Sequence, residues 1–338
     1  MIERVKVAVV GAGFMGQLHA RTVNECDSAE LVAIVDLNES LGQEVAARYG
    51  SSYVRNVEEL LEKDSVDTFI VALPDRLHVD VTSKILLAGK SVLLEKPMAD
   101  TLEGARQIAE AEKKGGGRLM VAHLLRFDPR YVGAANAVAN GSIGEVVHVS
   151  AKRFSLRNVG KRLAGSSSVC FYLGVHDVDA LQWVSGKRIT SVYARSVAKL
   201  MPSYGINSED AIFANFQYDD GTIGSLEISW ALPDYMPSGI NANLEVVGTE
   251  GVVRLDTSDH GLNVINQSGV VLPDGLHWPE VNNQIVGDLR DEILHFITAV
   301  RDGNEFVISV EEAMRAVAVN DAILKSVESG VPVDVERI

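Results

Sequence analysis

The fold is decided near the start of the chain, where an apolar run leads into three glycines: Val5-Lys6-Val7-Ala8-Val9-Val10-Gly11-Ala12-Gly13-Phe14-Met15-Gly16. The run is typical of a buried parallel strand, and the glycines form the pattern G-x-G-x-x-G at the start of a helix. In this pattern Gly11 permits a tight turn, Gly13 lets backbone N–H groups approach a pyrophosphate, and Gly16 lets helix and strand pack closely. The N-terminus of the helix then favours the negative charge of the phosphates. The stretch predicts a dinucleotide site with these contact residues: Gly11, Ala12, Gly13, Phe14, Met15 and Gly16.

A carboxylate stands at the end of the next expected strand, twenty residues after Gly16. Asp36 can accept hydrogen bonds from both hydroxyls of an adenine ribose, and it would repel a 2′-phosphate. The next residues are Leu37 and Asn38, so no arginine is at hand there to pair with such a phosphate. The cofactor predicted from this position is NAD rather than NADP.

The first third of the chain alternates short apolar runs with helical periodicity. We expect strands at 5–10, 31–36, 68–73, 91–95 and 119–123, and helices at 14–25, 39–49, 57–63, 76–89 and 101–115. Alternation of this kind indicates an α/β fold with a Rossmann doubly wound parallel sheet. Residues 1–123 are the predicted NAD-binding domain.

The remaining residues, 124–338, form a second predicted domain with longer strands and turn signals between them. Strands are expected at 145–154, 189–199, 211–218, 222–230, 241–247 and 251–256, with hairpin turns at 219–221 and 248–251 and helices at 175–185, 284–302 and 310–329. This pattern predicts an α+β domain with a large open, mainly antiparallel sheet.

Composition narrows the class of protein. The 338 residues are 46% hydrophobic and 23% charged, with a formal net charge of −15 and no lysine- or arginine-rich run. This favours a small-molecule partner and argues against nucleic acid and anionic membranes. Cys26 and Cys170 lack metal-ligand spacing, and no apolar run approaches the ~20 residues of a membrane span. We expect a cytoplasmic protein that binds no metal.

Several motifs beyond the glycine pattern carry a family resemblance. They are Leu73-Pro74 with His78, Ala88-Gly89-Lys90-Ser91-Val92 leading into Glu95-Lys96-Pro97, Arg126-Phe127-Asp128-Pro129, Gly174-Val175-His176-Asp177-Val178-Asp179, and Arg290-Asp291-Glu292 near the end. Over nearly its whole length the chain resembles the glucose-fructose oxidoreductase / inositol dehydrogenase (Gfo/Idh/MocA) family.

The resemblance implies roles for two residues. In that family the lysine of Glu-Lys-Pro and the histidine of the second-domain motif bracket the reacting carbon beside the nicotinamide, which here implies Lys96 and His176. A neutral imidazole can take the hydroxyl proton near pH 7, so His176 is the expected base, and Lys96 would hold and polarise the substrate oxygen. A cis Lys96–Pro97 peptide is also expected. The implied additional cofactor contacts are Leu73, Pro74, His78, Glu95 and Lys96.

The chain departs from the common family pattern four residues before the histidine. Many members carry an aspartate there that contacts substrate and the base, whereas this chain has Tyr172. The tyrosine is a candidate catalytic residue, because its neutral hydroxyl can donate as well as accept. The expected substrate contacts are Lys96, Arg126, Asn158, Tyr172, His176 and Tyr235. Asp177 and Asp179 remain possible substitutes for the aspartate.

The predicted function is hydride transfer between NAD and a secondary alcohol of a sugar, sugar derivative or cyclic polyol. Two alternatives remain open: an NAD-dependent glycosidase that transiently oxidises the sugar at C3, and a non-catalytic regulator that senses NAD or a sugar. The resemblance also implies a homodimer or homotetramer formed through the sheet of the second domain.

Overall fold

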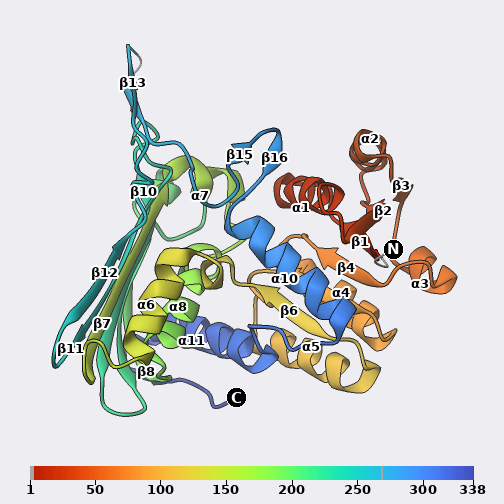
Figure 1. The fold of residues 1–338 in the computed structure, drawn as a ribbon. Helices are drawn as coiled ribbons and strands as arrows, with labels where there is room; N and C mark the ends of the chain where they lie inside the picture. The colour runs from red at the N-terminus through yellow and green to blue at the C-terminus, as the bar shows by residue number, and fades with distance from the viewer. Residues whose placement is uncertain (1–3, 268) are drawn as a thin grey trace. The chain divides into compact units, whose positions relative to one another are not determined.

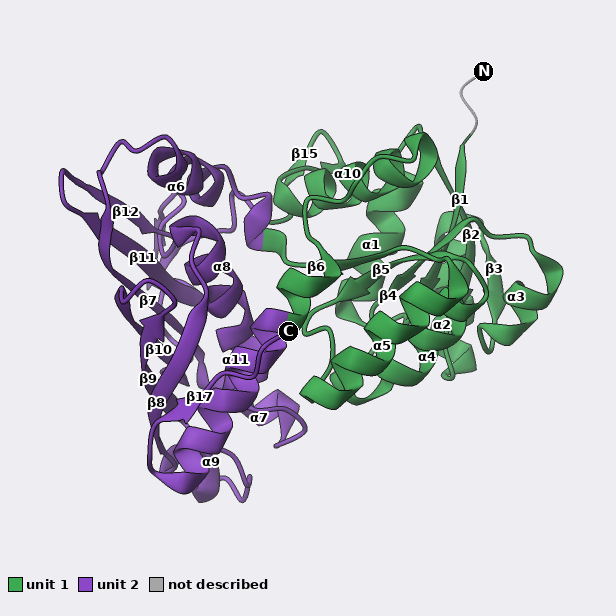
Figure 2. Ribbon diagram, turned by 90° about the horizontal axis from the view of Figure 1, so that it is seen from below, with its two compact units in different colours: residues 1–124, 277–314 green, residues 125–276, 315–338 purple. Residues whose placement is uncertain are grey.

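The computed structural model describes residues 4–267 and 269–338 and divides them into two compact units (Figure 2). Unit 1 contains residues up to Leu124 together with His277–Met314, and unit 2 contains Leu125–Leu276 with Arg315–Ile338. Residues 277–314, which lie in sequence between the two parts of unit 2, therefore group with the first domain.

Unit 1 is built on a six-stranded parallel sheet in the order β3-β2-β1-β4-β5-β6 (Figure 1). Its strands are β1 (Val5–Val10), β2 (Ala29–Val35), β3 (Ser52–Val54), β4 (Thr68–Val71), β5 (Ser91–Glu95) and β6 (Leu119–Ala122). The sheet is parallel and doubly wound, as predicted, and its strand order reverses between β1 and β4. The short edge strand β3 was not predicted. Three residues give too little apolar pattern to signal a strand.

The helices of unit 1 follow the predicted ranges closely. They are α1 (Phe14–Asn24), α2 (Glu39–Tyr49), α3 (Glu58–Lys63), α4 (His78–Leu87) after a 3₁₀ turn η1 (Asp75–Leu77), and α5 (Leu102–Gly115). Asn38 caps α2 and Thr101 caps α5, each accepting a hydrogen bond from a first-turn N–H group.

Helix α10 (Asp288–Asp302) comes from the later part of the chain and packs against α1 and β1. Its buried face includes Leu289, Ile293 and Phe296, the apolar stripe of a helix packed on a sheet. The predicted start at 284 was wrong. Gly287 adopts a φ of +93°, which a helix cannot continue through, so the helix begins after it.

Unit 2 contains a seven-stranded sheet in the order β12-β11-β7-β10-β9-β8-β17. The strands are β7 (Val146–Leu156), β8 (Ile189–Val197), β9 (Ala211–Tyr218), β10 (Ile223–Leu232), β11 (Ile240–Gly248), β12 (Val252–Asp256) and β17 (Val333–Asp334). Only the β7–β10 pair is parallel among these neighbours, so the sheet is mainly antiparallel as predicted. The predicted turns at 219–221 and 248–251 join β9 to β10 and β11 to β12.

Helices cover one face of this sheet (Figure 1). They are α6 (Pro129–Ala139), α7 (Arg157–Leu163), α8 (Val175–Ser185) after a π-helical turn η3 (Cys170–Gly174), α9 (Leu200–Ser203) and α11 (Val310–Ser329). The sequence reading missed α6 and α7. The sequence does contain a helix-start signal for α6, the dipeptide Asp128-Pro129. In the structure Asp128 caps the helix by accepting a hydrogen bond from the Arg130 N–H, and Pro129 occupies the first turn.

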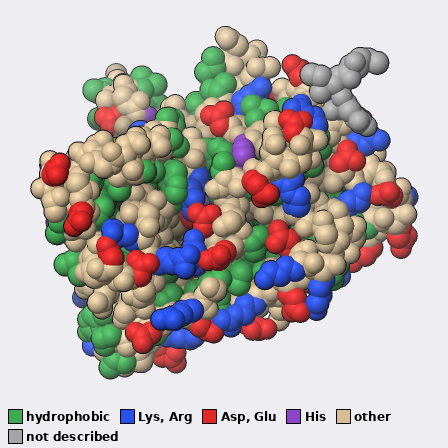
Figure 3. Space-filling model, turned by 60° about the horizontal axis from the view of Figure 1, so that its bottom comes forward, with side chains coloured by type: hydrophobic (Ala, Val, Ile, Leu, Met, Phe, Trp, Pro, Cys, Tyr) green, Lys and Arg blue, Asp and Glu red, His purple; other side chains and the backbone are tan. Residues whose placement is uncertain are grey.

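Two short hairpins complete the chain, β13 (Val264–Asn266) with β14 (Gly269–Val271) and β15 (Glu280–Val281) with β16 (Gln284–Ile285). Acidic and basic side chains are intermingled on the face drawn in Figure 3. Across residues 4–267 and 269–338, no helix combines the length and apolarity needed to cross a membrane.

Candidate functional site

The glycine turn after β1 has the shape that a dinucleotide site needs. Gly11 has a φ of +100°, and a Cβ atom there would lie 2.3 Å from the carbonyl oxygen of Ala72. A Cβ on Gly16 would lie 1.8 Å from the carbonyl oxygen of Gly11. A Cβ on Gly13 would meet nothing within 4 Å. Gly11 and Gly16 are thus required for packing, whereas Gly13 keeps the backbone open at the start of α1, where phosphates would bind.

Asp36 stands beside this turn at the carboxyl end of β2. Its Oδ2 accepts a hydrogen bond from the Ala12 N–H at 2.7 Å, and its Oδ1 accepts one from the Asn38 N–H at 2.7 Å. Tyr53 donates its hydroxyl to the Asp36 carbonyl at 3.0 Å. These contacts fix the carboxylate next to the glycine turn, and each oxygen keeps a further lone pair for a ribose hydroxyl.

His78 is fully buried and bridges two loops at the carboxyl edge of the sheet. Its Nδ1 lies 2.8 Å from the Pro97 carbonyl oxygen, and its Nε2 lies 2.8 Å from the Leu73 carbonyl oxygen. The loop after β4 is thereby tied to the loop after β5. The described contacts of His78 are with backbone, so its contact with a cofactor stays a prediction, as do those of Leu73 and Pro74. The Lys96–Pro97 peptide is cis, which confirms the expectation.

A buried pair of hydrogen-bonded side chains involves Glu95, the residue before Lys96. His19 Nε2 on α1 is 2.8 Å from Glu95 Oε1, and the Lys96 N–H lies 3.2 Å from Glu95 Oε2. Burial by itself raises the pKa of the Glu95 carboxyl, but the hydrogen bond from His19 and the charges of His19, Lys96 and His78 outweigh it, so the pKa lies below its usual value. Glu95 is therefore an ionised carboxylate inside the unit, and Lys96 itself is partly exposed.

Helix α10 adds two acids to this buried region. Asp288 and Glu292 are each 1% exposed, and Asp288 Oδ2 lies 2.8 Å from His277 Nδ1. Burial raises the pKa of Glu292 well above its usual value, and the charges of Glu95 and Asp288 raise it further. Among the described residues Glu292 Oε1 has no hydrogen-bond partner. The burial of these two acids was not predicted from the sequence. Asp288 and Glu292 are four residues apart on the apolar face of a helix, and this spacing indicates that they lie on the same buried face.

In unit 2, His176 is the second residue of α8, and Tyr172 lies one helical turn earlier on η3. Both side chains are partly exposed. Arg162 donates from Nη2 to the Tyr172 hydroxyl at 2.9 Å. The structure thus places the predicted base and the predicted tyrosine on consecutive turns of helical structure.

The two aspartates after His176 are buried and serve as ion-pair partners. The Asp179 carboxylate accepts two hydrogen bonds from Arg126, of 2.9 and 2.7 Å. The Arg126 guanidinium also lies over the Trp183 ring. Asp177 receives Arg153 at 2.6 and 3.1 Å. These bidentate pairs connect α8 to its neighbours. A substrate contact by Arg126 stays a prediction.

The other predicted substrate residues lie on the surface of unit 2. Asn158 is exposed, and its N–H donates to Asp234 Oδ1 at 2.9 Å. Tyr235 follows Asp234 and is 85% exposed. Neither position shows a described side-chain contact that fixes its orientation toward a ligand, so both stay predictions.

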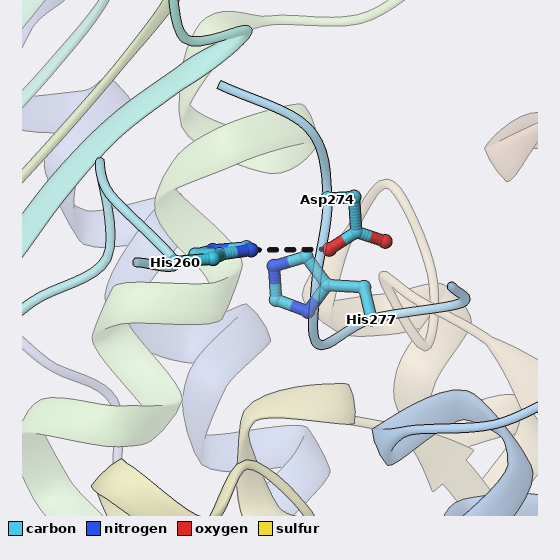
Figure 4. Close-up of side chains that lie close together, drawn as sticks. All are labelled: His260, Asp274 and His277. Atoms are coloured by element: carbon cyan, nitrogen blue, oxygen red, sulfur yellow. Dashed lines mark ion pairs between the residues drawn. The ribbon is translucent and has the colours of Figure 1, made fainter. Parts of the chain in front are cut away.

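His260 and Asp274 form an ion pair in unit 2, marked by the dashed line in Figure 4. In unit 2, His260 Nδ1 lies 3.3 Å from Asp274 Oδ1, but it also accepts the Gly275 N–H at 2.9 Å. In unit 1, His277 Nδ1 faces Asp288.

Comparison with known proteins agrees with this geometry. Residues 5–123 match the model described as an oxidoreductase family with an NAD-binding Rossmann fold, and residues 135–335 match the C-terminal alpha/beta domain of the same family. The chain belongs to the Gfo/Idh/MocA oxidoreductase family. It is an NAD-binding oxidoreductase.

Two similar proteins of known name and one solved structure illustrate the likeness. An inositol 2-dehydrogenase of Rubrobacter xylanophilus is 33% identical over 75% of this chain and 72% of its own length. A scyllo-inositol 2-dehydrogenase (NAD(+)) of Bacillus subtilis is 28% identical over 100% of this chain and 98% of its own. The crystal structure of GenD2 from gentamicin A biosynthesis in complex with NAD is 26% identical, has a TM-score of 0.87, and aligns over 99% of this chain and 97% of that chain.

Proposed function

We propose that this protein is an NAD-dependent dehydrogenase that moves a hydride between nicotinamide and a secondary alcohol of a sugar, sugar derivative or cyclic polyol. The observation that carries the proposal is the position of Lys96. Lys96 follows β5 at the carboxyl edge of the sheet, the edge that also holds the glycine turn and Asp36. The residue before it, Glu95, is buried and hydrogen-bonded to His19. The inositol dehydrogenases among its relatives support this substrate class.

The residues present fit NAD. The open backbone at Gly13 suits a pyrophosphate, and the carboxylate of Asp36 suits two ribose hydroxyls while repelling a 2′-phosphate. The chemistry that bound NAD would supply here is that of a hydride acceptor.

The chain's own residues would manage the proton and the oxygen. His176 takes the hydroxyl proton at an imidazole nitrogen as the C–H bond breaks. The Lys96 ammonium donates a hydrogen bond to the same oxygen, stabilises its developing negative charge and holds the carbon in place. Glu95 and His19 position the backbone from which Lys96 projects.

The two alternatives are less favoured. A glycosidase that works by transient oxidation would use the same Lys96 and His176, but the similar proteins above include inositol dehydrogenases. A regulator without catalysis has no need of either side chain, and this chain keeps both.

We also propose that the protein assembles as a homodimer or homotetramer through the seven-stranded sheet. Helices cover one face of that sheet (Figure 1), and the alternation of β9 directs Phe213 to the other face, where it is 51% exposed. Light scattering of the wild type and of Phe213→Glu tests this proposal, because a charge on that face should weaken the assembly.

The deciding experiment for the activity is NADH formation with a panel of cyclitols, aldoses, glycosides and nucleotide sugars. Stoichiometric NADH with a free polyol or sugar supports the dehydrogenase. Cleavage of a glycoside without net NADH supports the glycosidase. Binding without hydride transfer to any compound supports the regulator.

A further inference from the structure

One segment of unit 2 is positively charged in an acidic protein. Residues 146–176 contain five cationic side chains and no Asp or Glu, whereas the whole chain has a formal net charge of −15. The cations are Lys152, Arg153, Arg157, Lys161 and Arg162. The segment ends at His176, the proposed base.

The cations differ in how their charge is compensated. Arg153 is paired with the buried Asp177. Lys161 lies 3.7 Å from Asp234 and over the ring of Tyr204. Arg162 has neither kind of compensation: it is exposed, and its described partner is the neutral Tyr172 hydroxyl at 2.9 Å. No carboxylate of the described residues lies within ion-pair distance of its guanidinium.

Arg162 is also held near the proposed reacting group. The tyrosine that it binds lies four residues before His176, so both project from consecutive turns of the η3–α8 segment. Between Arg162 and η3 the chain runs through Gly165-Ser166-Ser167-Ser168, a loop rich in hydroxyl groups. In that loop Ser168 Oγ donates to Glu209 Oε1 at 2.6 Å, so the hydrogen-bond donors offered to an oxyanion here are those of the Arg162 guanidinium.

We propose that Arg162, oriented by Tyr172, binds an anionic group of the substrate, a carboxylate or a phosphoryl group. The proposal rests on the proposed function, because it places the reacting alcohol at His176. A guanidinium with four free donors binds planar oxyanions through paired hydrogen bonds, and such charge-assisted bonds are about twice as strong as neutral ones. The preferred substrate would then be an acidic sugar or a phosphorylated sugar or polyol rather than a neutral one.

The test is calorimetric binding to the NADH-loaded protein with two matched pairs of compounds. The first pair is D-glucuronate and D-glucose, which tests the carboxylate. The second is myo-inositol 1-phosphate and myo-inositol, which tests the phosphoryl group. We expect at least one acid to bind about ten- to a hundredfold more tightly than its neutral partner at low salt, because a charge-assisted bond is gained.

Three variants assign that preference. Arg162→Gln should reduce the preference for the acid over its neutral partner to about twofold or less. Arg162→Lys should restore part of this preference, because the positive charge returns without the planar guanidinium. Lys161→Gln is the matched control: it removes one charge from the same helix, but a charge already compensated by Asp234, so the preference should remain. Equal binding of acid and neutral compound by the wild type overturns the proposal, and so does a preference that survives in Arg162→Gln.

Failure of this inference is distinguishable from failure of the proposed function. NADH formation from neutral polyols, with no preference for either acid, keeps the dehydrogenase and overturns the anion site. An acid preference that depends on Arg162, without hydride transfer to any compound, supports the anion site and contradicts the dehydrogenase.

Discussion

His19 Nε2 lies 2.8 Å from Glu95 Oε1 inside unit 1, and Glu95 is the residue immediately before Lys96. His19 is 0% exposed and Glu95 is 8% exposed, so the pair is removed from water. A carboxylate in such a place needs a partner, because burial without one is costly. The glycine-turn helix α1 and the strand that leads to Lys96 are therefore joined by one buried interaction.

The first prediction follows from this pair. His19→Leu leaves the Glu95 carboxylate buried without its partner, and we expect the free energy of unfolding to fall by about 3 kcal/mol. Urea denaturation measures it. The double variant His19→Leu with Glu95→Gln should recover a large part, because the stranded charge is gone. A single variant within about 0.5 kcal/mol of the wild type would show that the pair is not closely coupled.

A second prediction concerns Glu292, whose pKa is raised by burial and by the charges of Glu95 and Asp288. The folded state then binds a proton that the unfolded state has released, so this residue's contribution to stability is complete below the unfolded pKa and is lost as pH rises through the folded pKa. Glu292→Gln cannot ionise and avoids that loss. Thermal melts from pH 5 to pH 9 should show the variant gaining on the wild type as pH rises. A constant difference across this range would mean that Glu292 does not titrate there.

A third prediction concerns cofactor choice. Asp36 faces the glycine turn through its bond to the Ala12 N–H, so NAD should be preferred over NADP by at least tenfold in kcat/KM, roughly 1.4 kcal/mol. Asp36→Asn keeps an acceptor and removes the charge, so it should narrow the preference mainly through better use of NADP. Equal efficiency of the wild type with both cofactors would show that Asp36 does not contact the ribose.

Most of the strands and the dinucleotide motif of unit 1 could be predicted from the sequence, because the patterns that indicate them are local. The glycine pattern, Asp36 and the strand ranges depend on near neighbours and on the direction of parallel strands, and β1 and β5 begin and end at the expected residues. The interaction between the buried acids could not be predicted from the sequence. Glu292 and Glu95 are nearly two hundred residues apart, and no local pattern indicates that their charges interact.

Unit 2 shows the same division. The strands β7 to β12 were predicted from alternation and turns, but α6 and α7 were not, although Asp128-Pro129 is a helix-start signal. The pairing of Asp179 with Arg126 also depends on tertiary contact between residues 53 positions apart. Candidate site residues could therefore be predicted from the sequence, whereas their hydrogen-bond and ion-pair partners could not.

A fourth prediction tests the proposed chemistry. Lys96→Ala and His176→Ala should each lower turnover by about 10²–10⁴ while NAD binding stays nearly unchanged, because neither residue is expected at the pyrophosphate. Turnover and NAD titration are measured on the same preparations. Gly13→Ala serves as the contrasting control, because its added methyl would enter the open backbone region and weaken NAD binding first. Loss of NAD binding in the Lys96 or His176 variant would contradict the placement, and near-normal turnover would remove that residue from the chemistry.

The last prediction concerns which residue near His176 supports the reaction, Tyr172 or Asp179. Asp179 is 2% exposed and makes two hydrogen bonds to Arg126, so its carboxylate is committed to that arginine. Tyr172 is partly exposed, and its hydroxyl accepts a hydrogen bond from Arg162 Nη2 at 2.9 Å.

We therefore expect Tyr172→Phe to lower kcat/KM several-fold to about a hundredfold, the effect of leaving one polar group unpaired, with little change in NAD affinity or in the free energy of unfolding. Asp179→Asn should act differently, because it leaves the buried Arg126 without its counter-charge and should lower stability by about 3–5 kcal/mol. Steady-state kinetics and urea denaturation on both variants separate the two effects. Wild-type kinetics for Tyr172→Phe, together with a collapse of activity in a stably folded Asp179→Asn protein, would return the supporting role to the carboxylate.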